Sequence, residues 1–193
     1  MTAFSMPCWK KLRALLSALS IALVSVAPLS AHAEGLAVKK AELIASEDWY
    51  FLQADFDIDL NKSLEEALEK GVSLNFLVDL EVTRPRWYWT DEVMVSARQN
   101  IRINYHALTR QYHLSSNNIT LSFNSLAEVK EQLKHIADWK VFERSVLKKG
   151  TAYRAALRMK LDIKQLPKPL QVEALGTKEW DLASEWFRFP LAP

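Results

Sequence analysis

Apolar and polar residues alternate along most of the chain, and the clearest example is residues 71–89, GVSLNFLVDLEVTRPRWYW. Every even-numbered position from 72 to 82 is apolar, whereas the odd-numbered positions between them are polar except for Leu77. Successive side chains of a β-strand point to opposite faces, so this pattern predicts a strand with one buried and one polar face. The strand runs into RPRWYW at 84–89, the densest cluster of aromatic and cationic residues in the chain.

The same alternation predicts further strands along the chain. They are expected at residues 38–44, 50–60, 93–105, 107–114, 119–123, 139–142 and 153–161. Turns are expected at Glu47 and Asp48, which would join the first two strands in a hairpin, and at residues 115–118. The strand at 93–105 is expected to have a strongly cationic outer face.

Two short helices are expected between the strands. Ser63 stands three residues before Glu66, and Ser125 stands three residues before Glu128. In such a capping box, each side chain of the pair accepts a hydrogen bond from a free backbone N–H at the helix start. Gly71 stands where the first helix should end in a left-handed conformation. The segment LPKPL at 166–170 is expected to be extended because of its two prolines. The pattern does not distinguish strand from helix after residue 176.

Nearly every predicted strand has a single apolar face. This is typical of antiparallel sheets packed face to face, and not of a parallel sheet covered on both sides. We therefore expect a mainly β fold, an antiparallel β-sandwich of about eight strands with two short capped helices. It would form one domain over residues 34–193. An α+β arrangement is the alternative.

The first 33 residues have the features of a secretory signal peptide. Lys10, Lys11 and Arg13 precede an apolar stretch at 14–26 that is too short to span a bilayer. Ala31-His32-Ala33 supplies the small residues that signal peptidase requires. We expect cleavage after Ala33 and export of the remaining chain; an uncleaved membrane anchor is the alternative.

Export would change both the charge and the cysteine content of the chain. Residues 1–33 contain three of the 25 Lys and Arg residues and none of the 23 Asp and Glu residues. The exported chain would therefore be close to neutral, which gives no support for a nucleic-acid surface. The only cysteine, Cys8, would also be removed. The exported chain would then have no disulfide, no Cys–zinc site and no cysteine nucleophile.

The strongest candidate for a binding surface is a cationic and aromatic patch at the end of the 72–82 strand and along the next two. Its members are Arg84, Arg86, Trp87, Trp89, Arg98, Arg102 and Arg110. Arginine presents a planar donor fork that suits carboxylate or phosphate and it stacks on tryptophan, so the patch suits an anionic group or a partner protein. Alternatively, the tryptophans belong to the core, the arginines cover their edges and Pro85 ends the strand.

Metal-binding patterns are weak in this sequence, and we expect no metal. A partial calcium-loop spacing is formed by Asp55, Asp57, Asp59, Asn61, Ser63 and Glu66. Leu60 stands where such a loop requires glycine, and the segment also alternates like a strand. The three aspartates are then the polar face of that strand, or an electrostatic contact surface. His106 and His113 are expected on opposite sides of one strand, which makes them poor co-ligands.

Signatures of catalysis do not occur in the sequence. The glycines are too scattered for a phosphate-binding loop or a G-x-S-x-G elbow, and there is no H-E-x-x-H. We therefore expect no catalytic activity and no cofactor. An enzyme would need carboxylates and histidines brought together from separate strands.

Four segments that span most of the chain after the signal peptide carry a family resemblance. They are SLEEALEKGV at 63–72, RPRWYW at 84–89, YHALTRQY at 105–112, and residues 158–186 with their LPKPL and W-x-L-x-S-E-W elements. The chain resembles an exported proteobacterial family, domain of unknown function 4390. The resemblance carries no site residues, but it implies periplasmic export. It also implies a role near envelope signalling, because family members tend to be encoded beside a membrane sensor kinase of the nitrogen-regulation type.

Together these observations favour a periplasmic module that binds a protein and has no catalytic activity. The expected partner is an envelope protein such as the periplasmic domain of a sensor kinase, contacted through residues 84–89 or a sheet edge. Membrane contact would occur only through that partner. The first alternative is a binder of a small anionic or amphiphilic ligand held between the sheets and anchored by arginine. The second is an enzyme of undefined class.

Overall fold

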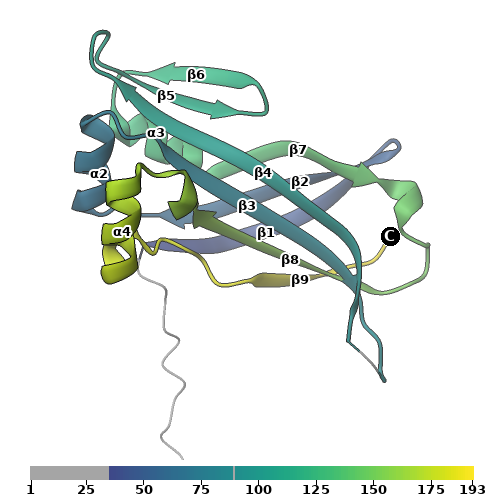
Figure 1. The fold of residues 1–193 in the computed structure, drawn as a ribbon. Coiled ribbons are helices and arrows are strands. Elements are labelled where there is room, and N and C mark those ends of the chain that lie inside the picture. Colours follow the sequence, from purple (N-terminus) through teal and green to yellow (C-terminus); the bar gives the residue numbers. More distant parts are fainter. Residues whose placement is uncertain (1–34, 89) are drawn as a thin grey trace, which may run out of the picture. The chain divides into compact units, whose positions relative to one another are not determined.

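The computed structural model describes residues 35–88 and 90–193. The expected signal peptide, its cleavage site and Trp89 therefore lie outside the described residues. The described part is mainly β, which confirms the expected fold class. It contains nine strands and three α-helices (Figure 1).

The secondary-structure elements follow one another in the order that Figure 1 labels. The strands are β1 (Leu36–Ser46), β2 (Trp49–Ile58), β3 (Leu74–Arg84), β4 (Glu92–His106), β5 (Gln111–Ser116), β6 (Ile119–Phe123), β7 (His135–Glu143), β8 (Tyr153–Leu161) and β9 (Phe187–Leu191). The α-helices are α2 (Lys62–Glu69), α3 (Leu126–Leu133) and α4 (Lys168–Gly176), and short 3₁₀ helices occur at Arg144–Val146, Ile163–Gln165 and Lys178–Trp180.

The strands form two antiparallel sheets of unequal width. One has three strands in the order β1-β2-β7, and the other has six in the order β6-β5-β4-β3-β8-β9. Figure 1 shows the narrower sheet behind the wider one. Because three strands cannot cover six, α3 and the chain around α4 supply part of the remaining cover.

The core lies between the two sheets and depends most on β3. The inward-facing side chains of β3 are all fully buried: Leu74, Phe76, Val78, Leu80 and Val82. The first four share one apolar cluster with inward-facing residues of β2 such as Leu52 and Phe56, whereas Val82 belongs to a second, smaller cluster. Burying side chains of this size stabilises the fold by about 1.5–3 kcal/mol each. The alternation seen in the sequence therefore predicted the correct inner face.

The predicted helices are present, but the first begins differently. The N-cap of α2 is Asn61, whose side-chain oxygen accepts a hydrogen bond from the Leu64 backbone N–H at 3.0 Å. Ser63 lies inside the helix and donates to the Glu179 carboxylate, so the Ser63 capping box is wrong. Ser125 does cap α3 as predicted. Gly71 adopts the expected left-handed conformation, with φ at 88°.

Two other local predictions differ from the structure, and one open question is answered. Residues 107–110 form a turn, so β5 begins at Gln111 and not at residue 107. The LPKPL segment is not extended throughout, because α4 begins at Lys168 with Pro169 in its first turn, where proline lacks only an N–H that would be unpaired anyway. The undecided C-terminal stretch contains β9, which pairs with β8. None of the described helices has the length and apolar character needed to cross a membrane.

Candidate functional site

The β3–β4 hairpin extends the two longest neighbouring strands of the wide sheet into a projecting loop (Figure 1). Pro85 directly follows the last residue of β3, as predicted for a strand end. At the base of the loop, the guanidinium groups of Arg84 and Arg86 both contact the Oε2 atom of Glu92. Hydrogen bonds from Arg86 and then Arg84 hold the pKa of the Glu92 carboxyl below its ordinary value. These three residues therefore fix the base of the hairpin with a shared ion pair.

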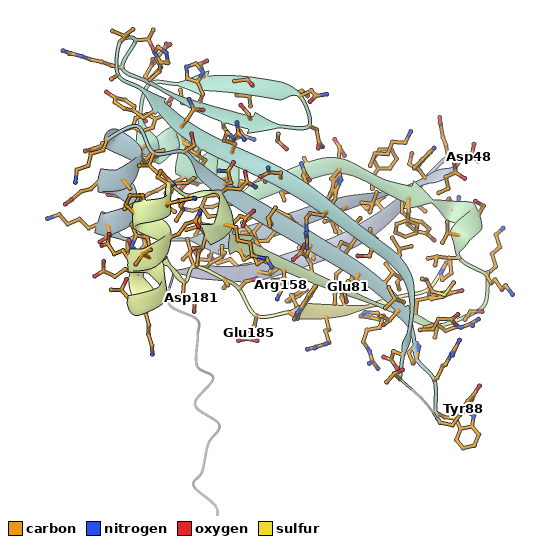
Figure 2. The ribbon with its side chains drawn as sticks, in the orientation of Figure 1. Asp48, Glu81, Tyr88, Arg158, Asp181 and Glu185 are labelled. Carbon is orange, nitrogen blue, oxygen red and sulfur yellow. The ribbon has the colours of Figure 1, made fainter. Side chains whose placement is uncertain are left out.

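Beyond this base, the hairpin exposes aromatic side chains to solvent. Trp87 is 94% exposed and Tyr88 is 64% exposed. Their rings meet edge to face with centroids 5.1 Å apart. Figure 2 shows Tyr88 at the far end of the hairpin, directed away from both sheets. The alternative that places the tryptophans of this segment in the core is wrong for Trp87. We call Trp87 and Tyr88, together with Arg86 beside them, the hairpin tip.

A second polar arrangement lies on the outer face of the wide sheet, centred on Asp79. Asp79 and Asn75 belong to the polar side of β3, yet they are only 5% and 3% exposed. The strand register places Asp79 between Arg98 of β4 and Arg158 of β8. Asn75 lies beside Arg102 in the same way. Neighbouring side chains therefore cover these two acceptors.

Asp79 is held by three cations from two neighbouring strands. Its Oδ1 atom accepts a hydrogen bond from Arg98 Nε at 2.6 Å, and its Oδ2 atom accepts one from Arg158 Nη2 at 3.0 Å. Lys160 Nζ lies 3.7 Å from the same Oδ2. Burial opposes ionisation of this carboxyl, but the hydrogen bonds and charges of the cations outweigh it and leave the pKa of Asp79 below its ordinary value.

Aromatic and amide groups hold the arginines in place. The guanidinium of Arg158 lies 4.4 Å from the centre of the Trp186 ring, within cation–π distance. Arg102 donates from its Nε atom to Asn75 Oδ1 at 2.9 Å. Arg98 and Arg102 thus each use Nε for a buried acceptor. Their terminal Nη atoms make no hydrogen bond to the described residues, so they can receive an external anion.

A shallow hollow of about 340 Å³ lies beside these two arginines on the wide sheet. It is lined by Arg98, Gln99, Asn100, Arg102, Ser115, Ser116, Asn117 and Asn118. Arginine, amide and hydroxyl groups dominate the lining, and it contains no carboxylate. This composition suits a small anion or a polar ligand with several acceptor oxygens. We call it the arginine hollow.

The structure separates the predicted cationic and aromatic patch into three places. Arg98 stands six positions along β4 from Glu92 at the hairpin base, which is about 20 Å along a strand. Arg110 lies in the β4–β5 turn with φ at 55° and lines neither surface. Trp89 is outside the described residues. The sequence alone did not identify Asp79, Arg158 or Trp186.

The histidines and aspartates considered for metal binding have other neighbours. The rings of His106 and His113 lie 6.0 Å apart on neighbouring strands, so their assignment to opposite sides of one strand is wrong. Asp55 pairs with His135 at 2.7 Å, and Asp57 pairs with Lys39 at 3.0 Å. The described residues contain no group of three or more His, Cys, Asp and Glu side chains arranged to hold a metal ion. Asp59 and Glu66, near or within α2, each lie close to a lysine side chain.

Residues 33–190 match the family model described as "Domain of unknown function (DUF4390)", and the chain belongs to that family. This confirms the resemblance found in the sequence. No curated protein and no solved structure matches the chain.

The Asp79 cluster makes a testable contribution to stability. Asp79→Asn should lower the free energy of unfolding at neutral pH by about 2 kcal/mol, because it weakens two charged hydrogen bonds. The pKa of Asp79 is lower in the folded state than its unfolded value of 3.8. The contribution of the ionised carboxylate to the free energy of unfolding is therefore fully present above pH 3.8 and is lost as the pH falls from there through the folded-state pKa. Denaturant unfolding of both proteins at neutral pH and at steps below about pH 4 measures this difference.

Glu81→Gln is the matched control, because Glu81 lies on the same face of β3 two residues further along. It should change stability by less than about 0.5 kcal/mol. The electrostatic role of Asp79 would be contradicted if wild type and Asp79→Asn differed in free energy of unfolding by the same amount in acid as at neutral pH.

Proposed function

We propose that this member of the DUF4390 family is a non-catalytic periplasmic interaction module that binds an envelope protein through the hairpin tip. The observation that supports this most directly is the exposure of Trp87, which is 94% accessible at the end of a projecting hairpin. A large aromatic side chain kept in water gives no folding stability, so its position is better explained by a contact with another molecule.

The composition of the hairpin tip supports a protein partner. Tryptophan, tyrosine and arginine are the residues most enriched among those that dominate binding energy at protein interfaces. Trp87 and Tyr88 would provide the apolar anchors, and Arg86 would lie beside them.

The ion pairs at the base support binding without large rearrangement. Arg84 and Arg86 both contact Glu92, which joins the two arms of the hairpin. A fixed base reduces the conformational entropy that binding would otherwise remove from the loop. The tip would therefore be presented to its partner in a nearly constant orientation.

The compartment is inferred from the sequence, and the partner class is inferred from what the family resemblance implies. The charged start, short apolar stretch and Ala31-His32-Ala33 site support export with cleavage after Ala33. The tendency of the family to be encoded beside a membrane sensor kinase supports the periplasmic domain of such a kinase as the partner. Contact with the membrane would then be indirect.

A second candidate function is the binding of a small anionic ligand in the arginine hollow. The specific observation that favours it is the orientation of Arg98 and Arg102, whose Nε atoms are bonded to the buried acceptors Asp79 and Asn75. Arginines held in this way lose little further entropy when their Nη atoms bind phosphate or carboxylate.

The hairpin proposal predicts that Trp87→Ser combined with Tyr88→Ser weakens capture of the envelope partner at least about tenfold. The free energy of unfolding should not change, because both side chains are exposed. Capture of partners from envelope extracts after mild crosslinking, with purified wild type and variant at equal concentration, measures the loss.

Leu108→Ser is the matched control, because Leu108 is 92% exposed in the β4–β5 turn. It should leave capture unchanged. Undiminished capture by the double variant would refute the hairpin proposal. Binding of the wild type to protein-free phospholipid vesicles, lost in the double variant, would assign the tip to the membrane surface instead.

The second candidate predicts that inorganic phosphate shifts the Nε–H signals of Arg98 and Arg102 in an NMR titration. Arg102→Gln should weaken the apparent affinity about tenfold, because one charge-assisted contact is lost. Arg110→Gln is the control, since Arg110 is exposed and does not line the hollow. Equal effects of the two substitutions would indicate general charge screening and would remove the arginine hollow as a site.

A further inference from the structure

The unequal widths of the two sheets leave part of the inner face of the wide sheet uncovered. β7 is an edge of the narrow sheet and β6 is an edge of the wide sheet. Between them lies a groove of about 370 Å³, closed at one end by α3. Its lining residues come from β4, β5, the β5–β6 turn, β6, α3 and β7.

More than half of the residues that line this groove are apolar, and the groove is partly open to solvent. Ile101 and Leu114 are buried at its floor, where they belong to the main core cluster. Ile119 and Leu121 of β6 line it as well, but they are 64% and 43% exposed. Inward-facing side chains of a sandwich are normally covered by the opposite sheet, so these two residues lack that cover. An apolar ligand would supply it.

One buried polar side chain also lines the groove and lacks a complete set of partners. Gln99 is 7% exposed on the otherwise apolar inner face of β4. One end of its amide is bonded to the Ser116 hydroxyl at 2.6 Å. The other end is buried and has no hydrogen-bond partner among the described residues. An unmet polar atom of this kind destabilises the fold unless another group satisfies it.

We propose that the groove binds an uncharged amphiphile, a molecule with an aliphatic chain and a hydroxyl or amide group. The chain lies against Ile101, Leu114 and Leu121, and the polar group bonds to the unpartnered end of the Gln99 amide. A hydroxyl can both donate and accept, so it satisfies either end of the amide.

The charged residues that line the groove favour an uncharged ligand. The lining contains no lysine or arginine, and its acidic residue is Asp138. His135 also lines it, but that imidazole is paired with Asp55. A carboxylate or phosphate head group inside the groove would meet the Asp138 charge without a cation in the lining to offset it, because the nearby Arg98 and Arg102 line the separate arginine hollow.

The shape of β7 argues against a peptide strand as the occupant. Adding a strand to an exposed sheet edge requires a regular row of backbone donors and acceptors. Asp138 has φ at 54° in the middle of β7, and the pairing of β2 with β7 changes register between Leu52 and Ala54. Irregularities of this kind interrupt an edge and prevent further pairing.

The test is a methyl NMR titration of the exported protein with 1-decanol and, separately, with decanoate below its micelle concentration. Decanol should give saturable shifts confined to groove methyl groups such as those of Ile101, Leu114 and Ile136. Decanoate should bind at least about tenfold more weakly. Shifts spread over the surface without saturation, or equal binding of the two compounds, would overturn the proposal.

Gln99→Leu separates a binding role for this residue from a structural one. It should weaken decanol binding about tenfold, the effect of one hydrogen bond, without lowering the free energy of unfolding. A structural role predicts the reverse, a less stable protein with unchanged affinity for decanol.

Leu121→Glu tests the site without altering the core, because Leu121 lies at the exposed mouth of the groove. It should abolish saturable decanol binding, whereas Val172→Glu on α4, at a position 71% exposed, should not. A dimer of the wild type that Leu121→Glu disrupts would assign the groove to a second copy of the chain. None of these outcomes depends on the hairpin tip, so this inference and the proposed function can fail independently.

Discussion

The burial of β3 is the constraint on which the rest of this structure depends. β3 lies between β4 and β8 in the wide sheet, and its inner row from Leu74 to Val82 is fully buried. Its outer row is also largely covered, because Asn75 and Asp79 accept hydrogen bonds from arginines of the neighbouring strands. Apolar packing on one face and charged hydrogen bonds on the other therefore fix the register of three adjacent strands.

The surfaces available for binding follow from this arrangement. The β3–β4 pair continues past the core into the hairpin, where Trp87 stays almost fully exposed to solvent. The same register orients Arg98 and Arg102 through their Nε atoms, so their terminal nitrogens face solvent. On the inner side, the wide sheet extends beyond the narrow one, which leaves the groove beside Gln99. The hairpin and the groove thus lie where the packing between the two sheets ends, and the orientation of the two arginines follows from the strand register.

Period-two alternation was sufficient to predict the mainly β fold and the buried face of β3, because burial on one side of a strand leaves a direct trace in the sequence. The burial of Asp79 leaves no such trace, since a carboxylate at a polar position is expected to face water. Its partner Arg158 stands 79 residues away in the chain, and only the strand order reveals that they are neighbours. The residues of the predicted cationic and aromatic patch lie apart in the structure for a related reason. Arginines that follow one another along β4 are close in sequence, but an extended strand moves each residue about 3.3 Å further from the hairpin.

Site-specific photo-crosslinking in living cells tests the central claim most directly. A benzoylphenylalanine residue at position 87 keeps an aromatic group on the hairpin tip, and the same residue at position 108 or 172 provides exposed controls. The hairpin proposal predicts one discrete adduct from position 87 that contains a single envelope protein, and no such adduct from the controls. No protein adduct from position 87, or the same mixture of adducts from all three positions, would contradict it.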